Sequence, residues 1–157
     1  MTSFSDLVPI VALGSTAFVA GLLWIFSACV MPALDSIQPA QSLAAMKIIN
    51  TDIVTPVFVP LFLASLGASV AAVVVSVGSL PEDGWLLAGG AIHLVGAMAV
   101  TAAVHLPLNN RFESLDESPA AVAEWQAGAT RWTRFNHVRA TAAILAAIAY
   151  AVHLAIS

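Results

Sequence analysis

Four long stretches without a charged residue divide the chain, and they constrain its fold more than any motif does. They cover residues 7–34, 53–81, 85–110 and 140–157. Each has at least 18 residues, close to the length that an α-helix needs to cross about 30 Å of hydrocarbon at about 1.5 Å per residue. The pattern therefore predicts four membrane-spanning helices, at residues 7–31, 55–79, 86–107 and 137–156.

The composition favours the same fold class. Hydrophobic residues make up 60% of the 157 residues and charged residues 9%, and the mean hydropathy is +0.93, which is unlike a soluble globular domain. We expect residues 1–157 to form a single all-α integral membrane domain, a four-transmembrane-helix bundle. The net charge of −4 is too small to indicate a partner. The sequence has no basic patch, so no nucleic-acid partner is expected. The single cysteine, Cys29, excludes an internal disulfide and a paired-cysteine metal motif.

The basic residues predict the orientation, because the cytoplasmic loops of membrane proteins are rich in Lys and Arg. All five lie in the first and third loops or at their ends, at Lys47, Arg111, Arg131, Arg134 and Arg139. These loops should face the cytoplasm and both termini should lie outside, with the chain in the cytoplasmic (inner) membrane. No Lys or Arg precedes the first apolar run, unlike in a signal peptide, so the first helix is expected to be retained.

Both cytoplasmic loops carry helical patterns of their own. In the first, Pro39 can open a helix whose apolar positions recur on one face. In the third, Ser118 and Pro119 form a typical N-cap and first-turn pair, and Trp125 and Trp132 follow at helical spacing. We expect two interfacial helices, at residues 39–51 and 119–135. No proline follows Pro119, so the second helix can continue directly into the fourth span.

Prolines near the cytoplasmic side should interrupt the spans. Pro32 is expected to close the first span, and Pro107 to distort the last turn of the third. Pro56 and Pro60 are expected to kink the second span just inside the same surface, which would free backbone carbonyls and open a cavity. A polar pocket capped by the first and third loops is the predicted result.

The four histidines fall into two depth classes. His105 and His137 lie near the cytoplasmic ends of their spans, and His93 and His153 near the outer ends. The inner pair has the more polar surroundings, because Thr101 precedes His105 by four residues and other polar or aromatic side chains lie close in sequence. These are Asn109, Trp132, Asn136 and Arg139, with Asn50 and Asp52 at the start of the second span. We therefore expect the inner pair to mark a functional pocket.

Three segments together resemble a known family. They are residues 21–63, residues 104–116 ("VHLPLNNRFESLD") and residues 131–143 ("RWTRFNHVRATAA"). Their most specific parts are Pro-Leu-Asn at 107–109 and the Arg-Trp-x-x-x-Asn-His-x-Arg that ends at Arg139. They resemble the anthrone oxygenase-like family of small four-helix membrane proteins, most of which are known only as a domain of unknown function. The resemblance implies the cofactor-free oxidation of a polyphenolic anthrone to a quinone.

The chemistry of an anthrone defines which residues could act on it. An anthrone is a carbon acid whose anion can give an electron to O₂, so the protein must supply a base and donors that stabilise the anion. His137 or His105 could be the base. Oxyanion and substrate contacts are expected from Arg139, Asn136, Asn109 and Trp132, with Asn50 and Met46 of the first loop. The expected partners are membrane lipid, O₂ and a hydrophobic aromatic small molecule, without a cofactor.

Two other functions stay open. A metal- or haem-dependent oxidase could use His105 and His137, or His93 and His153, as ligands from two spans. A non-enzymatic membrane carrier or assembly protein would need the polar residues only to bridge helices, the tryptophans only as interface anchors, and the arginines only for topology. Small residues in the spans also leave a homo-oligomer open.

Overall fold

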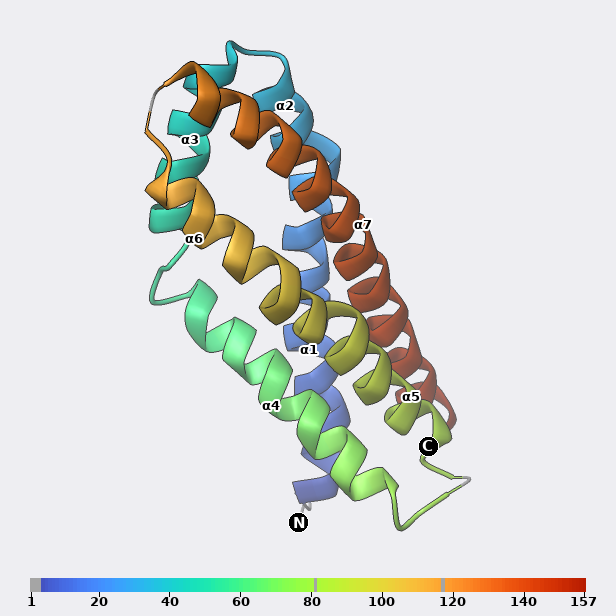
Figure 1. Ribbon diagram of the computed structural model, residues 1–157. Helices are drawn as coiled ribbons and strands as arrows, with labels where there is room; N and C mark the ends of the chain where they lie inside the picture. Colours follow the sequence, from blue (N-terminus) through green and yellow to red (C-terminus); the bar gives the residue numbers. More distant parts are fainter. Residues whose placement is uncertain (1–3, 81, 117) are drawn as a thin grey trace.

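The computed structural model describes residues 4–80, 82–116 and 118–157, and the elements within these ranges are helical (Figure 1). Four helices or runs of joined helices are long and apolar enough to cross a membrane: Ser5–Asp35, Phe58–Ser76, Gly84–Ser114 and Pro119–Ile156. The predicted all-α fold and its four apolar helices are therefore confirmed. In chain order the elements are α1 (Phe4–Ile25), η1 (Phe26–Val30), α2 (Met31–Asp35), α3 (Pro39–Asp52), α4 (Phe58–Ser76), α5 (Gly84–Ile92), η2 (His93–Ala99), η3 (Thr101–His105), α6 (Leu106–Ser114) and α7 (Pro119–Ile156), where η denotes a π-helix.

The four long helices form an elongated bundle. α7 packs against α1 and α5, and α4 packs against the same two helices from the other side. Both described chain ends lie at one end of the bundle, and α2, α3 and the first turns of α7 lie at the opposite end (Figure 1). This second end is called the roof below, defined as α2, α3, α6 and residues 119–130 of α7.

Two prolines near the roof, Pro32 and Pro107, lie inside continuous helical runs, contrary to the expectation that Pro32 ends the first span. The helix continues through Pro32 to Asp35, and through Pro107 to Ser114. In each case a π-helical turn comes immediately before the proline: Met31 donates its N–H to the Phe26 carbonyl, and Leu106 to the Thr101 carbonyl, each five residues back. Because proline has no N–H and its ring presses on the preceding turn, a wider turn at that point lets the helix go on.

Pro56 and Pro60 do not kink the second long helix. α4 begins only at Phe58, so Pro56 precedes it and Pro60 falls in its first turn, where a missing N–H costs little. The Thr55 hydroxyl accepts a hydrogen bond from the Phe58 N–H at 3.0 Å. The prolines therefore delay the start of the helix and leave residues 53–57 as an irregular linker between α3 and α4.

The roof is held together by an aromatic core and by polar contacts. Trp125 and Phe112 meet edge to face with ring centroids 4.8 Å apart, and both are buried with Met46. Lys47 donates a hydrogen bond from Nζ to the Leu115 carbonyl at 2.8 Å. Trp125 and Trp132 are thus buried inside the protein, although a role as interface anchors would place them on its surface.

The start of α7 follows its sequence signature. Ser118 accepts a hydrogen bond from the Ala121 N–H through Oγ at 3.3 Å, and Pro119 occupies the first turn. Asp116 accepts a hydrogen bond from the Ser118 N–H at 3.0 Å, and hydrogen bonding from Ser118 holds the pKa of Asp116 below its usual value. An exposed ion pair joins Arg111 of α6 to Glu124 of α7, with Nε–Oε1 and Nη2–Oε2 distances of 2.5 and 2.7 Å.

Glycine allows the closest approach of α4 and α5. A Cβ atom at Gly90 would lie 2.8 Å from the Ser69 carbonyl oxygen and 2.8 Å from Cγ2 of Val73. We expect Gly90→Ala to lower stability by about 1–3 kcal/mol, because the backbone contact cannot yield without moving a helix. Thermal unfolding of the purified protein in detergent micelles measures this.

The matched control is Gly67→Ala in α4, where a Cβ would meet no atom within 4 Å. This variant should be at least as stable as the parent, because alanine favours a helix over glycine. Equal losses of melting temperature in the two variants would contradict the close contact at Gly90.

Candidate functional site

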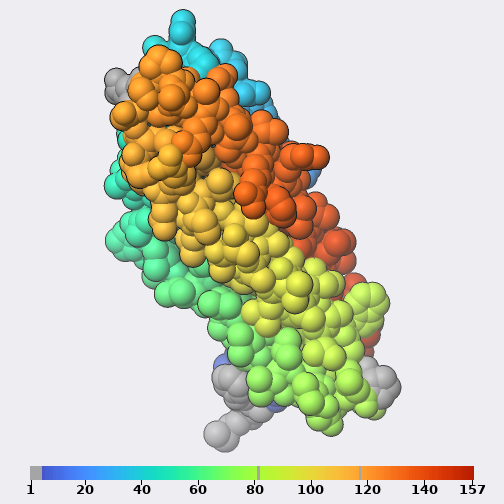
Figure 2. All heavy atoms as spheres, in the orientation of Figure 1, coloured from blue at the N-terminus to red at the C-terminus, as the bar shows by residue number. Residues whose placement is uncertain are grey.

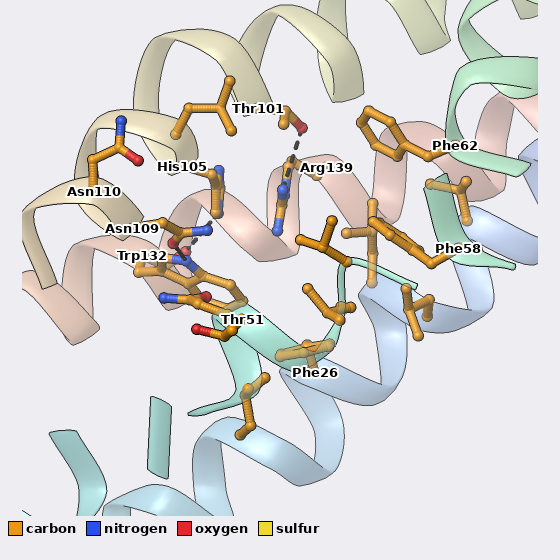
Figure 3. Close-up of a pocket in the computed structure, with 18 of the residues that line it drawn as sticks. Phe26, Thr51, Phe58, Phe62, Thr101, His105, Asn109, Asn110, Trp132 and Arg139 are labelled. Carbon is orange, nitrogen blue, oxygen red and sulfur yellow. Dashed lines mark hydrogen bonds between the residues drawn. The ribbon is translucent and has the colours of Figure 1, made fainter. Parts of the chain in front are cut away.

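A cavity of about 450 Å³ lies at the level where the roof joins the bundle, within the range typical of small-molecule sites. Its walls come from α1 and η1, the end of α3 with the 53–57 linker, the first turns of α4, η3 with α6, and α7 (Figure 3). Most of the wall is apolar, with Phe26, Phe58 and Phe62 contributing aromatic rings. Such a cavity suits a hydrophobic small molecule.

Arg139 brings a charge to this apolar wall. Its side chain is only 7% exposed, and its guanidinium donates from Nε and Nη2 to Asn136 Oδ1, at 3.2 and 2.6 Å, and from Nη1 to Thr101 Oγ1 at 3.2 Å. These bonds use three of its five N–H groups and leave one on each terminal nitrogen. Among the described residues no carboxylate pairs with Arg139. The cation is therefore positioned by neutral groups and can accept an anionic partner.

Asn136 fixes the guanidinium from behind and does not itself line the cavity. It is fully buried, and its Nδ2 donates to the Leu23 carbonyl at 2.8 Å and to Ser27 Oγ at 2.7 Å. These donors leave Oδ1 as the acceptor for Arg139. Ser27 lies in the π-helical turn η1, so the same turn that admits Pro32 also helps to orient Asn136.

Trp132 is held on several sides. Its indole N–H donates to Asn109 Oδ1 at 2.8 Å, and its ring meets the His105 ring edge to face with centroids 4.9 Å apart. The Arg139 guanidinium carbon lies 5.4 Å from the centroid of the same ring. Because the N–H is already used, Trp132 offers the cavity a rigid aromatic wall and not an oxyanion donor.

His105 lines the cavity and is almost fully buried. Its Nε2 lies 3.2 Å from the Trp132 carbonyl oxygen, and a carbonyl can only accept, so Nε2 carries the hydrogen. Nδ1 is then the nitrogen with the free lone pair. It is buried, has no hydrogen-bond partner among the described residues, and is shielded from the cavity.

The structure brings together most of the residues that the sequence predicts for the site. The five that line the cavity are Asn50, His105, Asn109, Trp132 and Arg139. Asn136 lies directly behind Arg139. Met46 does not reach the cavity wall and is buried in the roof core beside Trp125.

His137 is placed away from this cavity. It is exposed on the outer face of α7, where it borders a shallow apolar groove with Gly96 and Ala142. His137 follows Asn136 directly, and each residue turns the helix by about 100°. Adjacent residues of one motif therefore face different surroundings. The inner histidine pair expected from depth therefore does not meet in one cavity.

The outer pair of histidines also has separate partners. His93 Nε2 lies 3.3 Å from Ser65 Oγ in the bundle interior, and His153 Nδ1 lies 3.9 Å from Asp83 Oδ1 near the chain termini. In the part of the chain that the structure describes, no three His, Cys, Asp or Glu side chains form a group that could hold a metal ion. The proposed pairs of histidine ligands stay a sequence-based alternative.

Several lining residues could not be found from the sequence motifs. Phe58 and Phe62 are four residues apart on α4, and their ring centroids lie 5.6 Å apart. This spacing was the only sequence feature that indicated that they share a face. Glu113 lines the cavity from the last turn of α6. In the sequence, a carboxylate close to the end of a span indicates only a solvated residue. Ser27 does not line the cavity but supports Asn136 behind it, and no sequence motif indicated this role.

The sequence model of the anthrone oxygenase family matches residues 52–149, more than half of the chain. The chain belongs to the anthrone oxygenase family. The matched region runs from the end of α3 into the second half of α7 and includes His105, Asn109, Trp132, Asn136 and Arg139. No curated protein and no solved structure gives a significant match to the chain.

Proposed function

We propose that this protein is an integral membrane oxygenase that uses O₂ to convert an anthrone-type hydroxyaromatic into a quinone, without a cofactor. One observation carries the proposal: a buried arginine with free N–H groups, which pairs with no carboxylate in the described part of the chain, stands in the wall of an apolar cavity. Such a site favours a flat molecule that becomes an anion. Membership of the anthrone oxygenase family supports the reaction class.

The first step is the loss of a proton from the CH₂ carbon of the anthrone. The resulting negative charge spreads to the oxygen of the former ketone, which the free N–H groups of Arg139 stabilise in a cavity of low dielectric. His105 accepts the proton on Nδ1. Because Nδ1 is shielded from the cavity, the transfer requires the imidazole ring to turn toward the substrate.

The second step is oxidation of the anion. The electron-rich carbon gives electrons to O₂ and forms a bond to one oxygen atom, and the carbon is oxidised to a ketone. The second oxygen atom leaves as water after it takes up two protons. The balance is one anthrone and one O₂ giving one anthraquinone and one H₂O, so no external reductant is needed.

Purified protein tests this proposal directly. With an anthrone as substrate, the protein should consume one mole of O₂ for each mole of quinone formed, with the quinone measured by its visible absorption. With ¹⁸O₂, one labelled atom should enter the quinone. Activity that is lost with a chelator and restored by a stoichiometric metal would overturn the cofactor-free part, and no turnover of any anthrone would overturn the reaction class.

We also propose that the bundle spans the cytoplasmic membrane with its roof toward the cytoplasm. The four apolar helices and the exposed hydrophobic side chains along them support insertion. Lys47, Arg111, Arg131 and Arg134 lie in the roof or just below it, as the distribution of positive charge in membrane proteins requires. A periplasmic reporter enzyme fused to the C-terminus should be active in cells, whereas a cytoplasmic fluorescent reporter at that position should not.

A further inference from the structure

The exposed residues of the cavity wall are confined to two segments. Five of its lining residues are exposed, and they lie on two segments: Thr51 and Val54 at the end of α3 and in the linker, and Leu106, Asn110 and Glu113 on α6. The other lining residues are buried or half-buried. The α3 helix that leads into the linker contacts α6, and the linker lies beside α6 in Figures 1 and 2, which share one orientation. The mouth of the cavity is therefore the gap between them.

The residues at the rim of this mouth change from apolar to polar along the bundle. Val54 is 67% exposed and Leu106 is 54% exposed, and both belong to the part of the rim nearer the apolar bundle. Asn110 follows Leu106 by one helical turn, about 6 Å, and Glu113 and Thr51 are likewise polar. An apolar half and a polar half in one mouth indicate that it straddles the boundary between hydrocarbon and headgroups.

We propose that the cavity is filled from within the bilayer, through a lateral portal between Val54 and Leu106. This inference rests on the proposed membrane insertion and names the class of molecule that the site takes: neutral, flat aromatics that dissolve in lipid and carry a hydroxyl group. Val54 and Leu106 contact lipid, so a molecule can pass between them without leaving hydrocarbon. Asn110, Thr51 and Glu113 hold its hydroxyl end at headgroup level, while Arg139 is reached last.

A cysteine inside the cavity can report this route without any turnover. Val19 lines the cavity and is only 1% exposed, so a thiol in Val19→Cys is reached only through the cavity. The exposed Cys29 is first removed by Cys29→Ser. Proteoliposomes then receive either a neutral benzyl methanethiosulfonate or the anionic sulfonatoethyl reagent. The anionic reagent is attracted by Arg139, so slow labelling cannot result from charge repulsion in the cavity.

The neutral reagent should label the Val19→Cys thiol about 100-fold faster than the anionic one, because a charge entering hydrocarbon is strongly disfavoured. Val54→Trp and Leu106→Trp should each slow the neutral reagent several-fold by filling the portal. Val95→Trp is the bulk-matched control, being 70% exposed on α5–η2 far from the rim. Val8→Cys, buried in the core and lining no described cavity, should react with neither reagent.

Three results would overturn the portal. They are equal labelling by both reagents, no labelling of Val19→Cys by either, and fast neutral labelling that neither rim tryptophan slows. Because the measurement uses no anthrone, the portal can fail while the oxygenase activity stands, and the activity can fail while the portal stands.

Discussion

Arg139→Gln should lower kcat/KM for an anthrone by about 10²–10³-fold, the loss typical of a removed oxyanion donor. The same substitution should leave the melting temperature unchanged or raise it. The guanidinium is buried and pairs with no carboxylate among residues 4–80, 82–116 and 118–157, so its desolvation opposes folding, whereas a neutral amide can still donate to Asn136 Oδ1. Opposite effects on activity and stability are the signature of a charge retained for function.

The matched control is Arg134→Gln, one and a half turns earlier on α7 and exposed. Its activity and melting temperature should stay close to those of the parent. Arg139→Lys keeps the charge but lacks the planar fork that binds Asn136 and Thr101 together, so its kcat/KM should fall between parent and Arg139→Gln. A fully active Arg139→Gln would remove the central element of the proposed mechanism.

His105→Gln should reduce kcat by about 10²–10⁴-fold, the usual contribution of a positioned general base. KM should change little, because glutamine can still donate to the Trp132 carbonyl and preserve the shape of the wall. Steady-state kinetics with a soluble anthrone in detergent measures both constants. The pH profile adds a second readout, since the variant should lose the ionisation that His105 contributes to kcat.

His137→Gln provides the comparison, because His137 belongs to the same motif as Asn136 and Arg139 but is exposed outside the cavity. We expect parent-like kinetics for this variant. If His105→Gln kept parent-like activity and His137→Gln were inactive, the base would lie on the outer face of α7. The cavity would then be rejected as the reaction site.

The fold was largely predictable because lipid imposes a simple rule on the sequence. Charged residues are excluded from the hydrocarbon, so the gaps between them indicate four apolar helices, as the structure has. The helix starts at Pro39 and at Pro119 were also predictable, since proline at the first turn and a serine cap act locally. The single helix from Pro119 to Ile156 followed from the lack of any later proline.

The candidate site was predictable only in part, because its geometry depends on which way each side chain faces. The sequence placed Arg139 and His105 near one depth, and they do share a cavity. It could not separate Asn136 from His137, whose faces differ by one residue. It also could not anticipate the π-helical turns η1 and η3, because such a turn holds more residues than a regular α-helical turn and shifts the faces that follow it.

α7 is one unbroken helix that runs from the roof to the other end of the bundle. Its 38 residues form one rod of about 57 Å at about 1.5 Å per residue, with no proline or break after its first turn. The rod carries Trp125 in the roof, Trp132 and Arg139 at the cavity, and Tyr150 near the far end. The backbone positions of these residues are therefore fixed relative to one another by one continuous helix. The opposite wall is less regular, because α3 ends in an irregular linker and α6 follows a π-helical turn. Under the proposed function, substrate passage uses this wall, whereas α7 supplies the charge that stabilises the anion.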